Sequence, residues 1–268
     1  MLALITKTIR QNRTTILVYI IISALLMWMY VAFFPSMLEE SEKFSEAFSA
    51  YPDDIFKAFG VDIETIFMSM EGFIAAENFS ILWPIMVIIL TTMLGGSAIA
   101  GEIDKGTIEV LLSQPVSRLK IYFSKFIAGV SVILIFTLGS IFSIVPFALL
   151  HDVKIDLSAY VNVSIIGFLF GLTIFSLSTM FSSMLSSRGK TASLTAGMMI
   201  VFYALNLISS FKESVENIKY LSLFYYYDYS AALLENKVSL QNVSVFLGIS
   251  IVCVVMGAVI FEKRDVAA

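Results

Sequence analysis

The sequence predicts an all-α, polytopic membrane protein with six transmembrane helices. Of its 268 residues, 58% are hydrophobic and 14% are charged, whereas a soluble domain is about 45–50% apolar and about 25% charged. Six windows contain no Asp, Glu, Lys or Arg, and even the shortest is long enough for a helix to cross a hydrocarbon core about 30 Å thick. The predicted spans are residues 15–37, 78–101, 122–150, 158–187, 191–211 and 240–261, within a single transmembrane domain of residues 1–268.

The distribution of charge predicts the orientation of these spans. With six spans, the two termini share one side of the membrane, and that side has a net charge of +6 against −10 on the other. Basic residues near span ends mark the cytoplasmic face. We therefore expect both termini in the cytoplasm of a plasma-membrane protein. The segments expected outside are residues 39–77, 151–157 and 212–237.

Several segments next to the spans are predicted to lie at the membrane surface. Residues 1–13 mix apolar and basic side chains, which favours an interfacial amphipathic helix, the alternative being a short solvated tail. Phenylalanines recur at nearly helical intervals through residues 39–77, so short amphipathic helices are expected there. The aromatic cluster at residues 224–227 is typical of an interfacial belt.

The residues that membrane enzymes and ion-coupled carriers use are missing from the predicted spans. Within the six charge-free windows, tyrosine is the only ionisable type besides the single cysteine, which disfavours a proton-coupled carrier. The one histidine, His151, cannot form a metal site alone. Residues 189–191 read Gly-Lys-Thr, as at the end of a P-loop, but Met184 stands where that motif requires its first glycine. We expect no catalytic residue, metal site or cofactor site in this chain, and no nucleic-acid partner.

The span at residues 158–187 carries a line of small and polar residues. Gly167 and Gly171 would allow a neighbouring helix to approach closely. The line continues at spacings of three and four, so it fits either helix packing or the lining of a translocation path. Its later members are Thr173, Ser176, Thr179, Ser183 and Ser187.

The loop between the second and third spans predicts a short helix that projects from the membrane. Thr107 is a suitable N-cap, Glu109 suits the first turn, and Pro115 ends the helix. Three aliphatic residues on two turns of a solvent-facing loop indicate docking into a groove of another protein. These residues are Ile108, Leu111 and Leu112.

The same loop resembles the signature of ABC-2 type transporter permeases. The matching run is Glu102-x-x-x-Gly106-Thr107-x-Glu109-x-Leu111-Leu112-Ser113-x-Pro115-Val116-Ser117-Arg118. The layout of the whole chain is also similar, from the basic start to the aromatic outside segment before the sixth span. The departures are Ile103, where such permeases often carry a charge, and the long outside segment at residues 39–77.

This resemblance implies a permease subunit of an ABC exporter that contains no enzyme site of its own. The loop would be the coupling helix that docks on a separate ATP-binding subunit, which would bind ATP and Mg²⁺. A second permease copy or a homologous permease would complete the path through the lipid membrane. The alternative is a membrane scaffold, immunity or sensor-complex protein that docks an ATPase without transporting anything. The expected coupling residues are Glu102, Gly106, Thr107, Glu109, Leu111, Leu112, Pro115 and Arg118.

Overall fold

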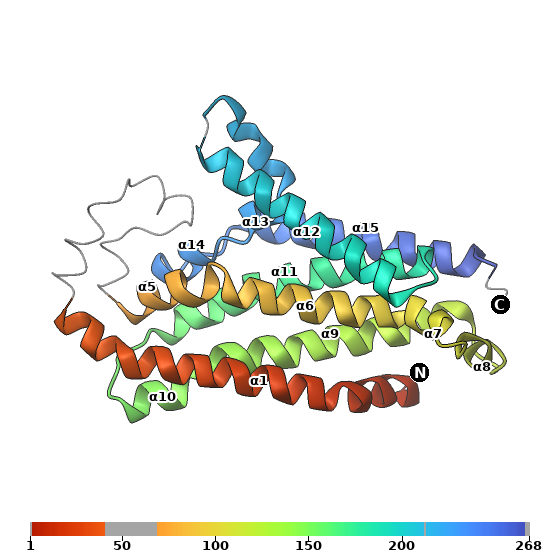
Figure 1. Cartoon of the computed structure of the whole chain (residues 1–268), viewed down its shortest axis with the longest axis horizontal. Helices are drawn as coiled ribbons and strands as arrows, with labels where there is room; N and C mark the ends of the chain where they lie inside the picture. Colours follow the sequence, from red (N-terminus) through yellow and green to blue (C-terminus); the bar gives the residue numbers. More distant parts are fainter. Residues whose placement is uncertain (1, 41–68, 212, 266–268) are drawn as a thin grey trace.

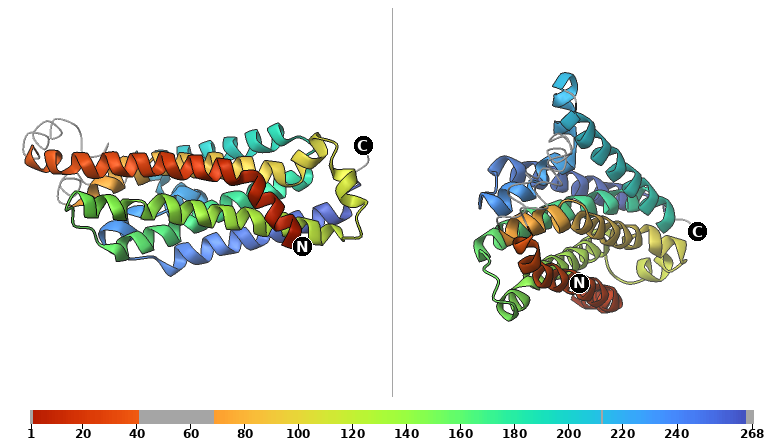
Figure 2. Two further views of the ribbon diagram at one scale, coloured as in Figure 1. Left: turned by 90° about the horizontal axis from the view of Figure 1, so that it is seen from below. Right: turned by 60° about the vertical axis from the view of Figure 1, so that its left-hand side comes forward.

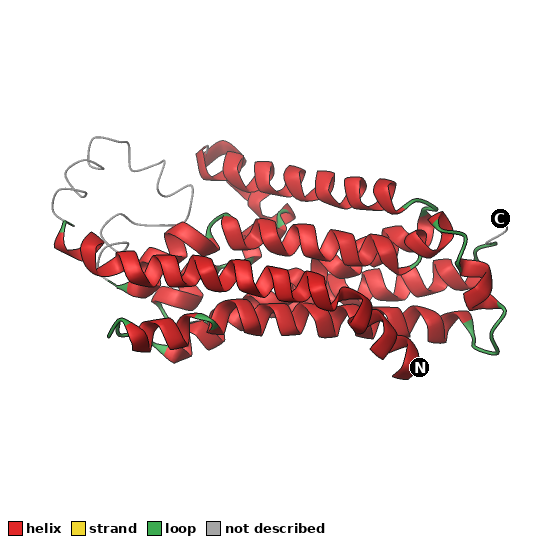
Figure 3. Cartoon of the chain, turned by 60° about the horizontal axis from the view of Figure 1, so that its bottom comes forward, coloured by secondary structure: helices red, strands yellow, loops and turns green. Residues whose placement is uncertain are grey.

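The computed structural model describes residues 2–40, 69–211 and 213–265, and the regular structure in these residues is entirely helical (Figures 1 and 3). Five segments are long and apolar enough to cross a membrane as continuous helices, or as two helices nearly in line. The prediction of an all-α membrane protein is therefore confirmed. These segments are Ile5–Glu39 within α1 (Leu2–Glu39), Arg118–Leu150 formed by α9 (Arg118–Phe142) and α10 (Ile144–Leu150), α11 (Leu157–Met184), α12 (Arg188–Phe211) and α15 (Leu240–Lys263).

A sixth candidate span is broken rather than continuous. Its first part is α5 (Met70–Ile74) followed by a π-helical turn at Ala75–Phe79, and its second part is α6 (Leu82–Ala98). The two parts meet at an angle of 45°. Pro84 contributes to the break because proline has no N–H with which to continue the backbone ladder from the preceding turn.

The long helices lie side by side, with α11 in the middle of the bundle. This helix packs against α6, α9, α12 and α15, while α1 packs against α9. Both termini and the short helix α8 (Ile108–Leu112) lie at one end of the bundle, and α5, α10 and α14 (Tyr229–Leu234) lie at the other (Figure 1). Helix α12 diverges from the bundle toward that second end, so it is the least buried of the candidate spans.

The N-terminal segment predicted to lie at the interface is the start of α1. Its first turns bend away from the rest of the helix (Figure 2). Lys7, Arg10 and Arg13 are exposed, whereas Ile9 packs against the main apolar core. The amphipathic pattern is therefore present, and the interfacial position stays a prediction.

Part of the aromatic cluster at residues 224–227 belongs to the protein core, and its role as an interfacial belt stays a prediction. Tyr227 is buried, and its ring lies 4.7 Å from that of Phe170 and 6.0 Å from that of Trp83, stacked on both. The chain here forms α13 (Leu223–Tyr226), which follows a 3₁₀ helix at Glu213–Leu221. The rings of Tyr226 and Tyr227 are therefore buried within the protein, whereas Phe224 and Tyr225 are half-buried. Short helices are also predicted over residues 39–77. Residues 41–68 of that segment lie outside the described residues.

Candidate functional site

The projecting loop between α6 and α9 contains two short helices joined by a tight turn. Helix α7 spans Ala100–Asp104 and is followed by α8. Gly106 lies between them with a φ of +68° and no neighbour within 4 Å of the position that a Cβ would take. That backbone conformation favours glycine, so the turn depends on its lack of a side chain. Ser117 then caps α9 by accepting a hydrogen bond from the backbone N–H of Lys120.

Glu102 is held between Lys125 and Thr107. Its Oε1 lies 2.5 Å from Nζ of Lys125, and the Thr107 hydroxyl donates to its Oε2. Thr107 occupies the N-cap position of α8 as predicted, but its hydroxyl makes this bond in place of the expected cap. Partial burial acts to raise the pKa of Glu102, but the hydrogen bonds from Lys125 and Thr107 outweigh it. The pKa therefore lies below its ordinary value of 4.5.

Replacement of Glu102 by Gln is expected to lower the stability of the loop at neutral pH by about 1–3 kcal/mol, since Lys125 loses its ionised partner and is only 10% exposed. A lowered carboxyl pKa stabilises the fold only while the group is ionised. The difference in stability between parent and variant should therefore be largest well above pH 4.5, and it should shrink as the pH falls below that value.

Thermal unfolding of both proteins in detergent between pH 4 and pH 8 measures this difference. Glu109→Gln is the matched control, because Glu109 is exposed on the same loop and forms no ion pair with another residue that the structure describes. A Glu102→Gln protein as stable as the parent at pH 7 would contradict the assigned role of the pair.

The apolar face of α8 packs mainly against its own chain. Ile108 is 4% exposed and contacts a small core that includes Tyr122 and Phe261. Leu111 and Leu112 are half-buried against the same core. The expectation that Ile108 enters another protein is therefore wrong, because Ile108 is buried in this core of its own chain. The apolar side chain that α8 exposes is Val110, at 63%, next to the exposed Glu109.

Arg118 and Arg264 connect this loop with the far end of the chain. The Arg118 guanidinium donates to the backbone carbonyl of Arg264. The Arg264 guanidinium in turn donates to the carbonyls of Ser183 and Leu185, each at 2.9 Å, at the end of α11. In the sequence, Arg264 and Lys125 are recognisable only as positive charges near span ends, because these contacts join residues far apart in the chain. Of the expected coupling residues, Pro115 is exposed and makes no such contact.

The glycines of α11 lie at close contacts between helices. A Cβ on Gly167 would come within 2.6 Å of the Trp83 ring. A Cβ on Gly171 would lie 3.1 Å from Val87 and 3.2 Å from Ile133. Gly167 therefore allows α6 to approach α11 closely, and Gly171 allows both α6 and α9 to do so.

The polar members of the line on α11 are buried and bonded to their own helix. Thr173, Ser176, Thr179 and Ser183 each donate to the carbonyl oxygen four residues earlier, at 2.7–3.2 Å. Thr173 also lies 3.0 Å from the Ser250 hydroxyl on α15. Ser187 lies beyond the end of α11 and accepts a bond from the Thr191 N–H. This geometry fits helix packing better than a polar path through the single chain.

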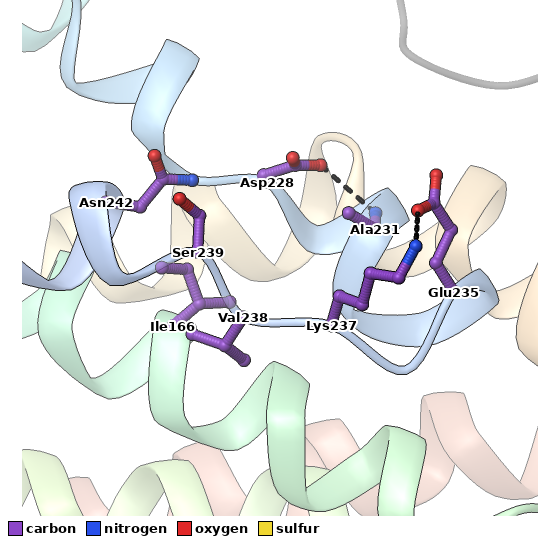
Figure 4. A pocket seen from close by; sticks show the side chains of 8 residues that line it. All are labelled: Ile166, Asp228, Ala231, Glu235, Lys237, Val238, Ser239 and Asn242. Atoms are coloured by element: carbon purple, nitrogen blue, oxygen red, sulfur yellow. Dashed lines mark hydrogen bonds and ion pairs between the residues drawn. The ribbon is translucent and has the colours of Figure 1, made fainter.

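A hollow of about 520 Å³ lies at the opposite end of the bundle, between α11, α14 and α15 (Figure 4). Asp228 accepts a bond from the Ala231 N–H, and Glu235 pairs with Lys237 at 3.1 Å. These charged groups are thus engaged within the chain. The residues that line the hollow are Ile166, Asp228, Ala231, Glu235, Lys237, Val238, Ser239 and Asn242.

The arrangement of long apolar helices is that of a multi-pass membrane protein. The family model described as ABC-2 family transporter protein matches residues 5–266, nearly the whole chain. The chain belongs to this family, which confirms the resemblance seen in the loop and makes it a membrane component of an ABC transporter. No curated protein matches the chain.

Proposed function

We propose that the chain is the permease subunit of an ATP-driven ABC exporter. The observation that carries this proposal is the position of the α7–α8 loop. In a chain of the ABC-2 family, this loop projects at the bundle end that also carries both termini (Figure 1). A loop of this kind can receive force from a second protein without entering the membrane.

The charge distribution supports a cytoplasmic position for this end of the bundle. The side with the termini has a net charge of +6, as expected for a cytoplasmic face in the plasma membrane. An ATP-binding subunit would therefore meet α8 from the cytoplasm. ATP and Mg²⁺ would bind on that subunit and not on this chain.

The exposed part of α8 provides the docking surface in this proposal. Val110 and Glu109 face solvent, while Ile108 holds the helix to its own chain. When ATP closes two bound subunits, the movement of α8 passes to the bundle through two links. These are the Glu102–Lys125 pair and the contacts of Arg118 and Arg264.

The translocation path in this proposal lies between two permeases, because the polar line on α11 is buried by packing within one chain. A second copy or a homologous permease would face the helices that the bundle leaves exposed. ATP would favour the outward-open arrangement only by the difference in its affinity for the two states.

The test is purification of the tagged permease from membranes, followed by ATP hydrolysis and flux measurements in proteoliposomes. We expect a subunit with Walker motifs to co-purify, and candidate solutes to accumulate in the vesicles only with Mg-ATP. Absence of such a subunit would contradict the proposal. A bound ATPase that hydrolyses ATP without any flux would favour the scaffold alternative.

A further inference from the structure

A one-residue break at Ile99 separates α6 from α7, where the span becomes the loop. Ile99 has φ −119° and ψ −56°, a φ well away from the helical value of about −63°, and it serves as the N-cap of α7 without a side-chain hydrogen bond. A helix start leaves backbone N–H groups without partners inside the helix, and an isoleucine side chain cannot accept from them. Ile99 and Ala100 are both fully buried, so these N–H groups require a partner within the protein.

Ser182 on α11 is that partner. Its Oγ accepts from the N–H of Ala100 at 2.8 Å and from the N–H of Ile99 at 3.1 Å. The same hydroxyl lies 3.4 Å from the carbonyl oxygen of Gly96, to which it donates. Ser182 is fully buried. One side chain of a different span thus caps α7 and also contacts the last turn of α6.

The surrounding contacts hold α6 and α11 at a fixed separation. One turn earlier on α11, Ser178 packs against Gly95, where a Cβ would overlap the serine side chain. The Ser178 hydroxyl donates to the Thr92 carbonyl at 3.4 Å. Asp104 at the end of α7 accepts from the N–H of Arg188 at 3.4 Å. Protein interiors are densely packed, and they switch between discrete arrangements instead of deforming continuously. A displacement of one helix in such a contact is therefore transmitted to its neighbour.

We infer that Ser182 is a positioning residue that transmits movement of the coupling loop to the centre of the bundle. Helix α11 is the most deeply buried of the five continuous candidate spans and packs against four other long helices. A displacement of α7 that reaches α11 is therefore passed to the rest of the bundle. This inference rests on the proposed function, since it assigns the route by which the ATP-binding subunit acts.

The test uses the complete complex in lipid nanodiscs and compares Ser182→Ala with Ser183→Ala. The Ser183 hydroxyl is also buried, but it donates only within its own helix, to Thr179. In a Cys253→Ser background, Val110→Cys reports docking at the loop and Asn242→Cys reports opening of the hollow at the far end. The rate of maleimide labelling is measured with and without Mg-ATP plus vanadate.

We expect vanadate trapping of the nucleotide after ATP hydrolysis to change labelling at Asn242→Cys several-fold in the parent and in Ser183→Ala. In Ser182→Ala this response should disappear, while the bound subunit still protects Val110→Cys. A full response at Asn242→Cys in the Ser182→Ala complex would overturn the inference. A parent that binds no ATPase would instead overturn the proposed function.

Hydrogen exchange on the parent complex gives a second measurement that needs no variant at position 182. The N–H groups of Ile99 and Ala100 should exchange as slowly as the core amides of α11 before ATP is added. Rapid exchange at both amides would also overturn the inference, because the capping bonds to Ser182 would then be absent.

Discussion

A permease with Val110→Asp is expected to fold normally and to lose its ATP-binding subunit. Val110 is 63% exposed in the middle of α8, so the substitution disturbs little within the chain. If the partner buries this side chain in an apolar groove, the new carboxylate has no partner there, and such burial costs several kcal/mol. A loss of about 3 kcal/mol lowers the affinity by about 100-fold.

Co-purification of the tagged permease with the ATPase measures this loss. Val110→Thr is the matched control because it keeps the shape of the side chain without adding charge, and it should retain most of the subunit. Ile108→Asp should behave differently, with a lower yield of folded permease, since Ile108 is 4% exposed inside its own chain. Parent-like recovery of the ATPase by Val110→Asp would show that this face of α8 is not the docking surface.

Gly95→Ala is expected to destabilise the bundle by about 1–3 kcal/mol or more, as overpacking of a dense interior does. The new Cβ would overlap the Cβ of Ser178 and lie 3.0 Å from the Ser178 backbone carbonyl carbon. That backbone belongs to the central helix α11 and cannot move aside as a flexible side chain would. The contact between α6 and α11 would therefore have to open.

Thermal unfolding in detergent measures the effect. Gly197→Ala is the control, because Gly197 also lies within a helix but has no neighbour within 4 Å of its Cβ position. Alanine there should be neutral or stabilise by up to about 1 kcal/mol through its higher helix propensity. Equal unfolding temperatures for Gly95→Ala and the parent would contradict the close packing of α6 on α11.

Hydropathy predicted the long helices well because membrane spans depend mainly on length and apolar composition. The first part of the bent span escaped this signal, because Glu71 and Glu77 interrupt its apolar residues and hydropathy places them outside the predicted span. Pro84 was the one local signal for the break. Likewise, the aromatic residues of a belt and of a core have the same composition, so the packing of Tyr227 on Phe170 could not be read from its neighbours in the sequence.

The loop helix was also predictable, but its contacts were not. Spacing alone indicated that α8 has an apolar face, and nothing local showed that Ile108 would turn toward Phe261. The bonds of Ser182 to Ile99 and of Arg264 to Ser183 join residues about eighty positions apart. Such pairs leave no periodic signal, so these parts of the site emerged only from the fold.

The most direct measurement of the central claim is photo-crosslinking from α8 in intact membranes. A photoreactive amino acid at Val110 should capture a protein with Walker motifs, and the adduct should change in yield when Mg-ATP and vanadate are added. The same probe at Leu149, which is 77% exposed at the opposite end of the bundle, should not capture that protein. Capture of the ATP-binding subunit from Leu149, or no capture from Val110, would contradict a coupling loop that docks an ATPase at α8.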